Sequence, residues 1–149
     1  MIGILILTHG GLGRELLAAA LKVNAGPLEA FEAVCLGWND RIEEARAKVG
    51  SAIGRLDQGS GVLVLTDMFG STPSNVAMSF LAPGKVEVLT GVNLPVVMRL
   101  ACQSRQGSEL VEFSRWLQAK GQKSVCLGSD MVPERKCENA AARPSSRRQ

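Results

Sequence analysis

The sequence has only one histidine, His9, and its four cysteines are widely separated, with no C-x-x-C pair. Because a structural zinc site needs about four closely spaced His or Cys ligands, the common zinc motifs are excluded. Nucleotide-binding motifs are missing as well. There is no G-x-x-x-x-G-K-S/T segment, and Leu16 stands where a G-x-G-x-x-G fingerprint needs its third glycine. The chain also lacks a G-x-S-x-G nucleophile elbow.

Long apolar runs are missing too. A membrane-spanning helix takes about 20 apolar residues, and no segment of this chain is that long. The opening run, residues 1–9, is short and has no basic residues before it, so it does not match a secretory signal peptide. We therefore expect a soluble, cytoplasmic protein without stable membrane insertion.

The net charge of +3 comes from one end of the chain. Residues 1–133 carry 12 basic and 12 acidic side chains, whereas residues 134–149 carry five basic and two acidic ones. A neutral folded part gives little support for nucleic-acid binding. Length and composition predict one globular domain over residues 1–130, followed by a basic, disordered tail over residues 131–149.

Apolar runs alternate with helical patterns along the domain. Runs without polar alternation indicate strands buried on both faces, as in a parallel sheet. Four such strands are expected, over residues 2–7, 31–38, 62–65 and 86–89. Helices are expected over residues 12–23, 40–56, 72–81, 96–102 and 109–120. This alternation predicts an open, mostly parallel, doubly wound α/β sheet with right-handed crossovers and the strand order 2-1-3-4.

Local signals predict where two of the helices begin. Asp40, with Glu43 three residues later, resembles a capping box. Thr72 followed by Pro73 places a hydroxyl at the N-cap and a proline in the first turn. The inward face of the helix after Asp40 is expected to carry Ile42, Ala45, Val49, Ile53 and Leu56. A last, short strand is expected over residues 124–127.

Polar residues follow three of the predicted strands at the point where each ends. Thr8-His9 follows the first strand, Thr66-Asp67 the third, and the segment 90–93 the fourth. In open parallel sheets, ligands and reacting groups gather beyond the carboxyl ends of the strands, where the strand order reverses. In a 2-1-3-4 order the first and third strands are neighbours, so His9 and Asp67 are expected in adjacent loops.

His9 and Asp67 together suit nucleophilic chemistry. A carboxylate bonded to one ring nitrogen fixes the tautomer of the imidazole and leaves the other nitrogen free as a nucleophile. Gly10 and Gly11 allow a close turn, and the helix that follows offers free N–H groups and a positive dipole end to an anion. The helix start at Thr72 adds a hydroxyl to the same edge. This arrangement predicts a phosphoryl group carried on His9.

The same residues also have purely structural interpretations. A lone histidine after a strand is often a surface or capping residue, and Asp67 and Thr72 can serve as caps. Gly91 and Asn93 fit turn positions. On the residues alone, two other functions stay open: a non-catalytic α/β binding module, and a small Ser-His-Asp hydrolase.

Three segments resemble the mannose-family enzyme IIA domain of the bacterial phosphoenolpyruvate-dependent sugar phosphotransferase system. They are Ile-Leu-Ile-Leu-Thr-His-Gly-Gly-Leu-Gly (4–13), Val-Leu-Thr-Asp-Met-Phe-Gly-Ser-Thr-Pro-Ser-Asn (64–75) and Thr-Gly-Val-Asn-Leu-Pro (90–95). The resemblance implies that His9 is phosphorylated by phospho-HPr and passes the phosphoryl group to a histidine of a IIB protein. Asp67 would orient His9, and Thr72 would assist the phosphoryl group.

The resemblance has further implications for partners. It implies a homodimer in which a C-terminal strand, matched by residues 124–127, crosses to the partner's sheet. Leu12, Met68 and Phe69 would lie near the docking surface, and no metal or organic cofactor is implied. No IIB domain follows in the sequence, so we expect the IIB acceptor to be separate or absent. Sugar transport with a membrane IIC/IID transporter and a regulatory phosphorelay are both compatible with this, and the sugar is not indicated.

Overall fold

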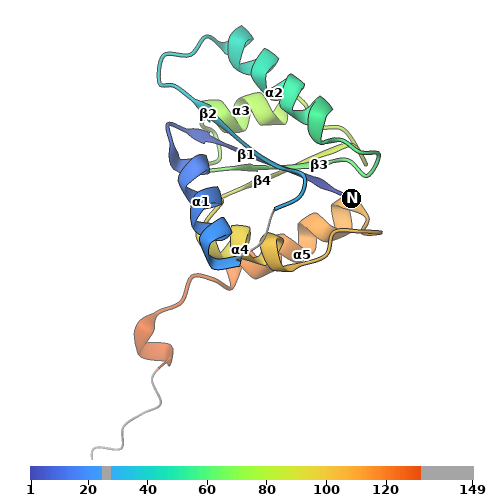
Figure 1. The fold of residues 1–149 in the computed structure, drawn as a ribbon. Coiled ribbons are helices and arrows are strands. Elements are labelled where there is room, and N and C mark those ends of the chain that lie inside the picture. The colour runs from blue at the N-terminus through green and yellow to red at the C-terminus, as the bar shows by residue number, and fades with distance from the viewer. Residues whose placement is uncertain (25–27, 132–149) are drawn as a thin grey trace, which may run out of the picture.

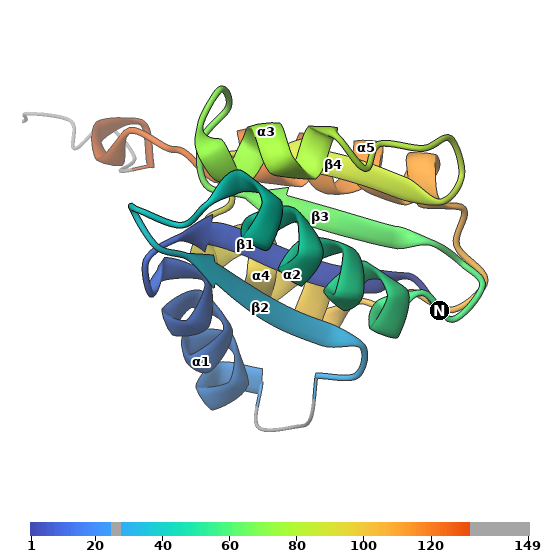
Figure 2. The same cartoon turned by 90° about the horizontal axis from the view of Figure 1, so that it is seen from above.

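A four-stranded sheet forms the centre of the structure, a computed structural model that describes residues 1–24 and 28–131 (Figure 1). The strands are β1 (Gly3–His9), β2 (Phe31–Leu36), β3 (Val62–Thr66) and β4 (Val86–Thr90). They lie side by side in the order β2-β1-β3-β4, and each neighbouring pair is parallel (Figure 2). The predicted strand order is confirmed, and the order reverses between β1 and β3.

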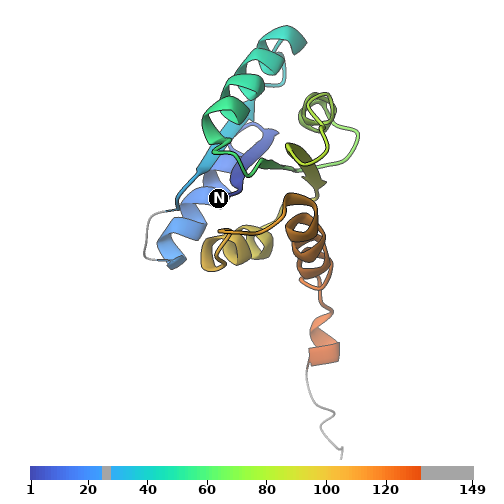
Figure 3. The ribbon, with the colours of Figure 1, turned by 90° about the vertical axis from the view of Figure 1, so that its right-hand side faces the viewer.

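Helices cover both faces of the sheet (Figure 3). On one face lie α2 (Ile42–Leu56) and α3 (Thr72–Met78). On the other lie α1 (Leu12–Asn24), α4 (Leu94–Cys102) and α5 (Leu110–Gln122). A short 3-10 helix spans Gly128–Met131. The architecture is the doubly wound α/β fold that the sequence predicted. None of the helices in the described part of the chain is long and apolar enough to cross a membrane.

The two central strands explain the unbroken apolar runs. Successive side chains of a strand point to opposite faces of the sheet. In β1, Ile4 and Ile6 therefore pack against the helices of one face, whereas Leu5 and Leu7 pack against those of the other, and all four are fully buried. Each such burial contributes about 1.5–3 kcal/mol. A strand covered on both sides holds the residue at its end in a fixed position.

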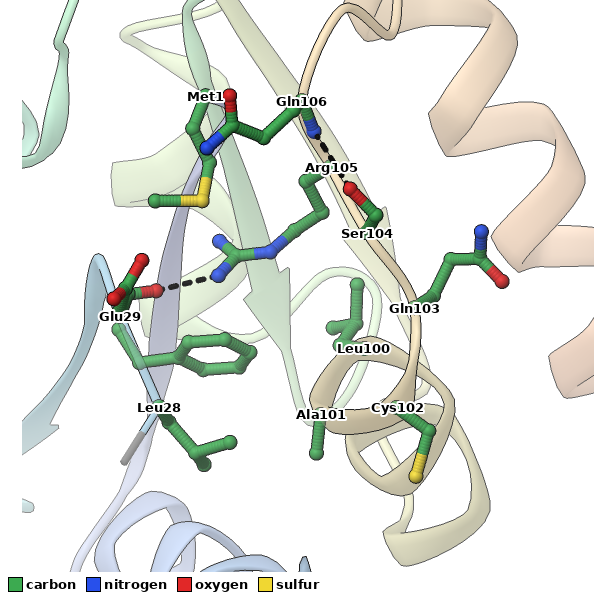
Figure 4. A pocket seen from close by; sticks show the side chains of 11 residues that line it. Met1, Leu28, Glu29, Leu100, Ala101, Cys102, Gln103, Ser104, Arg105 and Gln106 are labelled. Carbon is green, nitrogen blue, oxygen red and sulfur yellow. Dashed lines mark hydrogen bonds between the residues drawn. The ribbon is translucent and has the colours of Figure 1, made fainter. Parts of the chain in front are cut away.

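Arg105 connects segments at the amino ends of the strands, the end of the sheet opposite to His9 (Figure 4). Its side chain is 5% exposed, and its guanidinium donates hydrogen bonds to the backbone carbonyls of Ile2 and Glu29. It also lies over the ring of Phe31, 4.5 Å from the ring centroid. Burial lowers the pKa of Arg105, and the nearby Glu29 carboxylate opposes that shift. A cavity of about 290 Å³ opens beside this side chain. Arg105 thus ties together three segments that are distant in sequence.

Two predictions about the segment around α2 were wrong. Helix α2 begins at Ile42 after Arg41, which makes no side-chain cap, so Asp40 and Glu43 form no capping box. Asp40 instead pairs with Lys48 at 3.2 Å. Ile42 is exposed rather than inward, and the buried face of the helix consists of Ala45, Val49, Ala52 and Leu56.

The end of β2 also differs from the prediction. The strand stops at Leu36, because the backbone turns at Gly37, whose carbonyl accepts a hydrogen bond from the N–H of Asp40 at 3.2 Å. Trp38 therefore lies in a loop and not in the strand.

The C-terminal predictions concern a partner chain and the end of the sequence. Residues 124–127 form no strand in the described single chain, and the segment after α5 projects away from the body (Figure 1). Val125 and Leu127 in this segment are exposed. The swapped strand of a homodimer stays a prediction. Apart from Met131, the predicted tail of residues 131–149 lies outside the described residues.

Candidate functional site

His9 and Asp67 are in direct contact at the carboxyl edge of the sheet. His9 is the last residue of β1, and Asp67 follows β3 immediately. The ring Nδ1 of His9 lies 2.7 Å from Oδ2 of Asp67, and the backbone N–H of His9 donates to the same oxygen at 2.9 Å. The two side chains are only 18% and 13% exposed. Asp67 therefore holds His9 at two points, by its backbone and by its ring.

The charge of Asp67 is maintained by these contacts. Partial burial acts to raise the pKa of the Asp67 carboxyl. Burial is outweighed by the hydrogen bonds from the backbone and ring of His9, by the electrostatic attraction to His9 and by the hydrogen bond from the backbone N–H of Met68. The pKa of Asp67 therefore lies below its ordinary value. The carboxylate is therefore ionised at neutral pH.

An ionised carboxylate selects one form of the imidazole. Because a carboxylate only accepts hydrogen bonds, Nδ1 of His9 must carry the proton. In the neutral ring the lone pair is then on Nε2. Within residues 1–24 and 28–131 no group forms a hydrogen bond with Nε2. His9 is thus arranged as a nucleophile through Nε2.

Trp38 covers His9 from the loop that follows β2. The centroids of the two rings are 4.8 Å apart, and their planes differ by 16°, which is a stacked arrangement. Trp38 is nevertheless 81% exposed. Sequence reasoning missed this residue because it assigned Trp38 to the strand. The position of Trp38 could have indicated its role, because a residue just beyond β2 lies at the same carboxyl end of the sheet as His9 at the end of β1.

The backbone after His9 leads directly into α1. Gly10 has φ +50°, a conformation that favours glycine, and its N–H donates to the carbonyl of Leu36 at 2.9 Å. The buried hydroxyl of Thr8 accepts a hydrogen bond from the N–H of Gly13 at 2.8 Å. These contacts place the first turn of α1, with its positive dipole end, next to His9 in the chain.

Thr72 is exposed at the start of α3, and its predicted role as N-cap was wrong. Ser71 is the N-cap: its Oγ accepts from the N–H of Ser74 at 3.4 Å and donates to the carbonyl of Met68 at 2.7 Å. Within the described ranges, the Thr72 hydroxyl forms no hydrogen bond, either to His9 or to another residue. Thr72 lines a cavity of about 130 Å³ between α2 and α3.

The loop after β4 supports the site. The N–H of Val92 donates to the carbonyl of Thr66 at 2.9 Å, which joins this loop to the end of β3 beside Asp67. The side chain of Asn93 caps α4 by accepting a hydrogen bond from the N–H of Val96 at 2.9 Å. Asn93 thus has a structural role as the N-cap of α4, which differs from the turn position expected from the sequence.

Exposed apolar side chains accompany the site. Leu12, Met68 and Phe69, the three predicted docking residues, are all exposed, as is Trp38. Within residues 1–24 and 28–131, no three His, Cys, Asp or Glu side chains lie close enough together to bind a metal ion. The arrangement offers a nucleophilic imidazole, with exposed apolar side chains on the segments that follow β1, β2 and β3.

Known proteins with similar sequences belong to one system. A family model, EIIA-man, described as the fructose IIA component of the phosphotransferase system (PTS), matches residues 3–115. The fructose-specific EIIA component of Bacillus subtilis (strain 168) is 29% identical over 148 residues, which cover 96% of this chain and 97% of the relative. The mannose-specific EIIAB component of Escherichia coli (strain K12) is 32% identical over 103 residues, 65% of this chain and 30% of that protein.

Solved structures agree with this result. The mannose/sorbose specific IIA subunit from Enterococcus faecalis has a TM-score of 0.74 at 25% identity, covering 85% of this chain and 93% of that chain. A PTS IIA protein associated with the fucose utilization operon from Streptococcus pneumoniae has a TM-score of 0.74 at 27% identity, covering 87% and 94%. The EIIA component from Streptococcus agalactiae, at 22% identity, shares the fold with a TM-score of 0.76 and coverage of 87% and 99%.

Proposed function

Because the chain belongs to the EIIA-man family, the IIA components of the sugar phosphotransferase system, we propose that His9 accepts a phosphoryl group from phospho-HPr and passes it to a IIB protein. The observation that carries this proposal is the hydrogen bond of 2.7 Å between Nδ1 of His9 and Asp67. It leaves Nε2 as the nitrogen that reacts.

The transfer needs no proton to move. The lone pair of Nε2 attacks the phosphorus of the donor, and the Nε2–P bond forms while the bond from the donor nitrogen to phosphorus breaks. The donor nitrogen leaves with that electron pair, and the Nδ1 proton of His9 stays in its hydrogen bond to Asp67. Transfer to the histidine of the IIB protein repeats these steps with His9 as the leaving group. Positioning and charge stabilisation therefore account for catalysis.

Asp67 supplies the charge stabilisation. When Nε2 carries the phosphoryl group and Nδ1 keeps its proton, the ring is more positive than in the free histidine. An ionised carboxylate at hydrogen-bond distance favours that state, and a charge-assisted hydrogen bond is worth about 1.5–3 kcal/mol. Asp67 is already ionised and in place, so the protein does not have to reorganise during transfer.

Two further groups are proposed to contact the phosphoryl oxygens. The first turn of α1 follows His9 after only two residues, so its free N–H groups favour an anion there. The exposed Thr72 hydroxyl, at the start of α3, would donate to a phosphoryl oxygen. Its lack of a hydrogen-bond partner in the described residues leaves it free for this role.

The partner proteins are proposed to dock on the exposed apolar side chains near this edge. Leu12, Met68 and Phe69 offer such a surface. A IIB protein that receives the phosphoryl group would transfer it to a sugar, together with a membrane IIC/IID transporter. A regulatory relay without transport uses the same first step, and both roles place the protein in the cytoplasm.

A homodimer is part of the proposal. β4 is the last strand of the sheet in the described residues, and apart from the bridge between Val86 and Ala82 no segment of these residues pairs with its outer edge. A groove of about 270 Å³ lies between the end of β4, the start of α4 and the end of α5. The segment after α5, with exposed Val125 and Leu127, would cross to the corresponding edge of a second copy.

Phosphorylation of the purified protein tests the central claim. The wild type and His9→Gln would each be incubated with enzyme I, HPr and phosphoenolpyruvate, and intact mass measured without acidification. We expect the wild type to gain one phosphoryl group and His9→Gln to gain none. Subsequent addition of a IIB protein should return the wild-type mass to its starting value. No gain in the wild type would contradict the proposal.

A further inference from the structure

Local contacts shape the loop that carries Trp38. The N–H of Asp40 donates to the carbonyl of Gly37 at 3.2 Å, and a Cβ on Gly37 would lie 2.8 Å from Oδ1 of Asp40, so a side chain at this position would displace that carboxylate. Asp40 is in turn paired with Lys48 of α2 at 3.2 Å. The loop is thus fixed at both ends, by the strand β2 and by α2, and Trp38 extends from its middle.

Trp38 contributes little to the hydrophobic core. Its side chain is 81% exposed, and it is absent from both clusters of buried residues. Its defined contact is the stack on the ring of His9. A large apolar side chain left in solvent and directed onto a nucleophile is not explained by folding stability.

Asp67 alone does not fix the plane of the His9 ring. Two torsions, about Cα–Cβ and Cβ–Cγ, orient the ring, and one hydrogen bond at Nδ1 does not fix both of them. A coupled change in the two torsions would keep Nδ1 near Asp67 and move Nε2 away from the direction of the incoming phosphorus. An indole stacked at 4.8 Å with an interplanar angle of 16° opposes this motion on the side that it covers, because the ring would collide with it.

We propose that Trp38 is a positioning residue for phosphoryl transfer, which holds the plane of the His9 ring while Asp67 holds its Nδ1. This inference rests on the proposed function of His9. The indole also faces the ring when it becomes more positive on phosphorylation, and tryptophan is the aromatic side chain that cations prefer. Both effects favour the reacting geometry. A cation–π contact at an exposed site corresponds to a factor of about 2 to 5 in rate or equilibrium.

The first measurement examines the stack in the unphosphorylated protein. His9 is the only histidine, so its ring proton signals in NMR need no further assignment. Protons that lie over an indole are shifted upfield. We expect Trp38→Ala and Trp38→Leu to move the His9 signals downfield, and Trp38→Phe to restore part of the upfield shift. Trp116→Phe on α5, where Trp116 packs against Phe113 at 5.4 Å, is the matched control and should leave them unchanged.

The second measurement uses the kinetics of phosphorylation by phospho-HPr. A positioning role predicts that Trp38→Ala lowers kcat about 2- to 5-fold with little change in KM and an unchanged circular dichroism spectrum. Trp38→Phe should recover most of the rate and Trp38→Leu should not. A rise in KM alone would make Trp38 a docking contact and overturn the inference.

The two measurements separate this inference from the proposed function. If the wild type is phosphorylated on His9 and Trp38→Ala reacts at the same kcat, only the inference fails. Unchanged His9 signals in Trp38→Ala would also overturn it. If the wild type takes up no phosphoryl group, the proposed function is overturned. The positioning role then fails as well, even if the NMR signals demonstrate the stack.

Discussion

A single oxygen of Asp67 accepts two hydrogen bonds from His9, one from its backbone N–H at 2.9 Å and one from its ring Nδ1 at 2.7 Å. Main-chain pairing between β1 and β3 ends at Leu7 and Thr66, two residues before His9 and one before Asp67. The carboxylate therefore continues the contact between the two strands and uses it to orient the imidazole.

Replacing Asp67 should slow phosphorylation without unfolding the protein. Asp67→Ala removes the charge-assisted hydrogen bond to the ring, worth about 1.5–3 kcal/mol, so the rate should fall about 10- to 100-fold. Asp67→Asn keeps a hydrogen-bond acceptor but loses the charge, and its rate should lie between those of the wild type and Asp67→Ala. Rapid-quench kinetics with labelled phospho-HPr would measure both rates. Unchanged rates in Asp67→Ala would remove this residue from the mechanism.

The same carboxylate should make stability depend on pH. The pKa of Asp67 is lower in the folded state, so the folded protein binds fewer protons there than the unfolded chain. The resulting stabilisation is fully present above the unfolded pKa of about 3.9 and is lost as the pH falls through the folded pKa. Urea denaturation of wild type and Asp67→Asn should show a difference in free energy of unfolding that is constant above about pH 5 and shrinks below about pH 4. A difference that grows on acidification would contradict the assignment.

The sheet and the His9–Asp67 contact could be predicted from the sequence because both follow from general rules. Unbroken apolar runs identify buried parallel strands, and the 2-1-3-4 order brings the ends of the first and third strands together. The Trp38 stack depends instead on where β2 ends. The apolar character of the segment continues from Leu36 to Trp38, so the pattern extends the strand past the turn at Gly37 that actually ends it.

The N-cap of α3 was also predicted wrongly, as Thr72 instead of Ser71. Ser71 and Thr72 both carry hydroxyls just before Pro73, and the sequence alone does not distinguish them. The backbone of Ser71 is extended, with φ −78° and ψ 168°, and this conformation directs its hydroxyl to the N–H of Ser74. The correction matters for function, because a hydroxyl that is not used as a cap remains available to a ligand.

Substitutions at these two neighbours should therefore affect different properties. Ser71→Ala removes the N-cap of α3 and should lower the free energy of unfolding by about 1 kcal/mol. Thr72→Val should leave stability within about 0.5 kcal/mol and slow phosphoryl transfer about 10-fold, since one hydrogen bond to a charged group is lost. Thr72→Ser should retain the rate. Chemical denaturation and quench kinetics on the three variants would test this separation, and a normal rate in Thr72→Val would exclude its hydroxyl from the site.

Arg105 should be important for stability and unimportant for transfer. Arg105→Met leaves the backbone carbonyls of Ile2 and Glu29 without their donors, and we expect a loss of about 2–4 kcal/mol in the free energy of unfolding. Phosphorylation of the folded variant should be normal, because Arg105 lies at the opposite edge of the sheet from His9. Arg99→Met, an exposed position on α4, is the control and should change stability by less than about 0.5 kcal/mol. Equal stability of the two variants would contradict this structural role of Arg105.

The exposed segment after α5 should determine the oligomeric state. If Val125 and Leu127 pack on the β4 edge of a second copy, light scattering of the wild type should give twice the 15.8 kDa mass of one chain. Charges at an apolar contact cost several kcal/mol, so Val125→Asp with Leu127→Asp should shift the protein to monomers at micromolar concentration. Val23→Asp, at an exposed valine near the end of α1, should remain dimeric. The His9–Asp67 pair lies within one chain, so the monomeric variant should still accept a phosphoryl group, and a monomeric wild type would rule out the swapped strand.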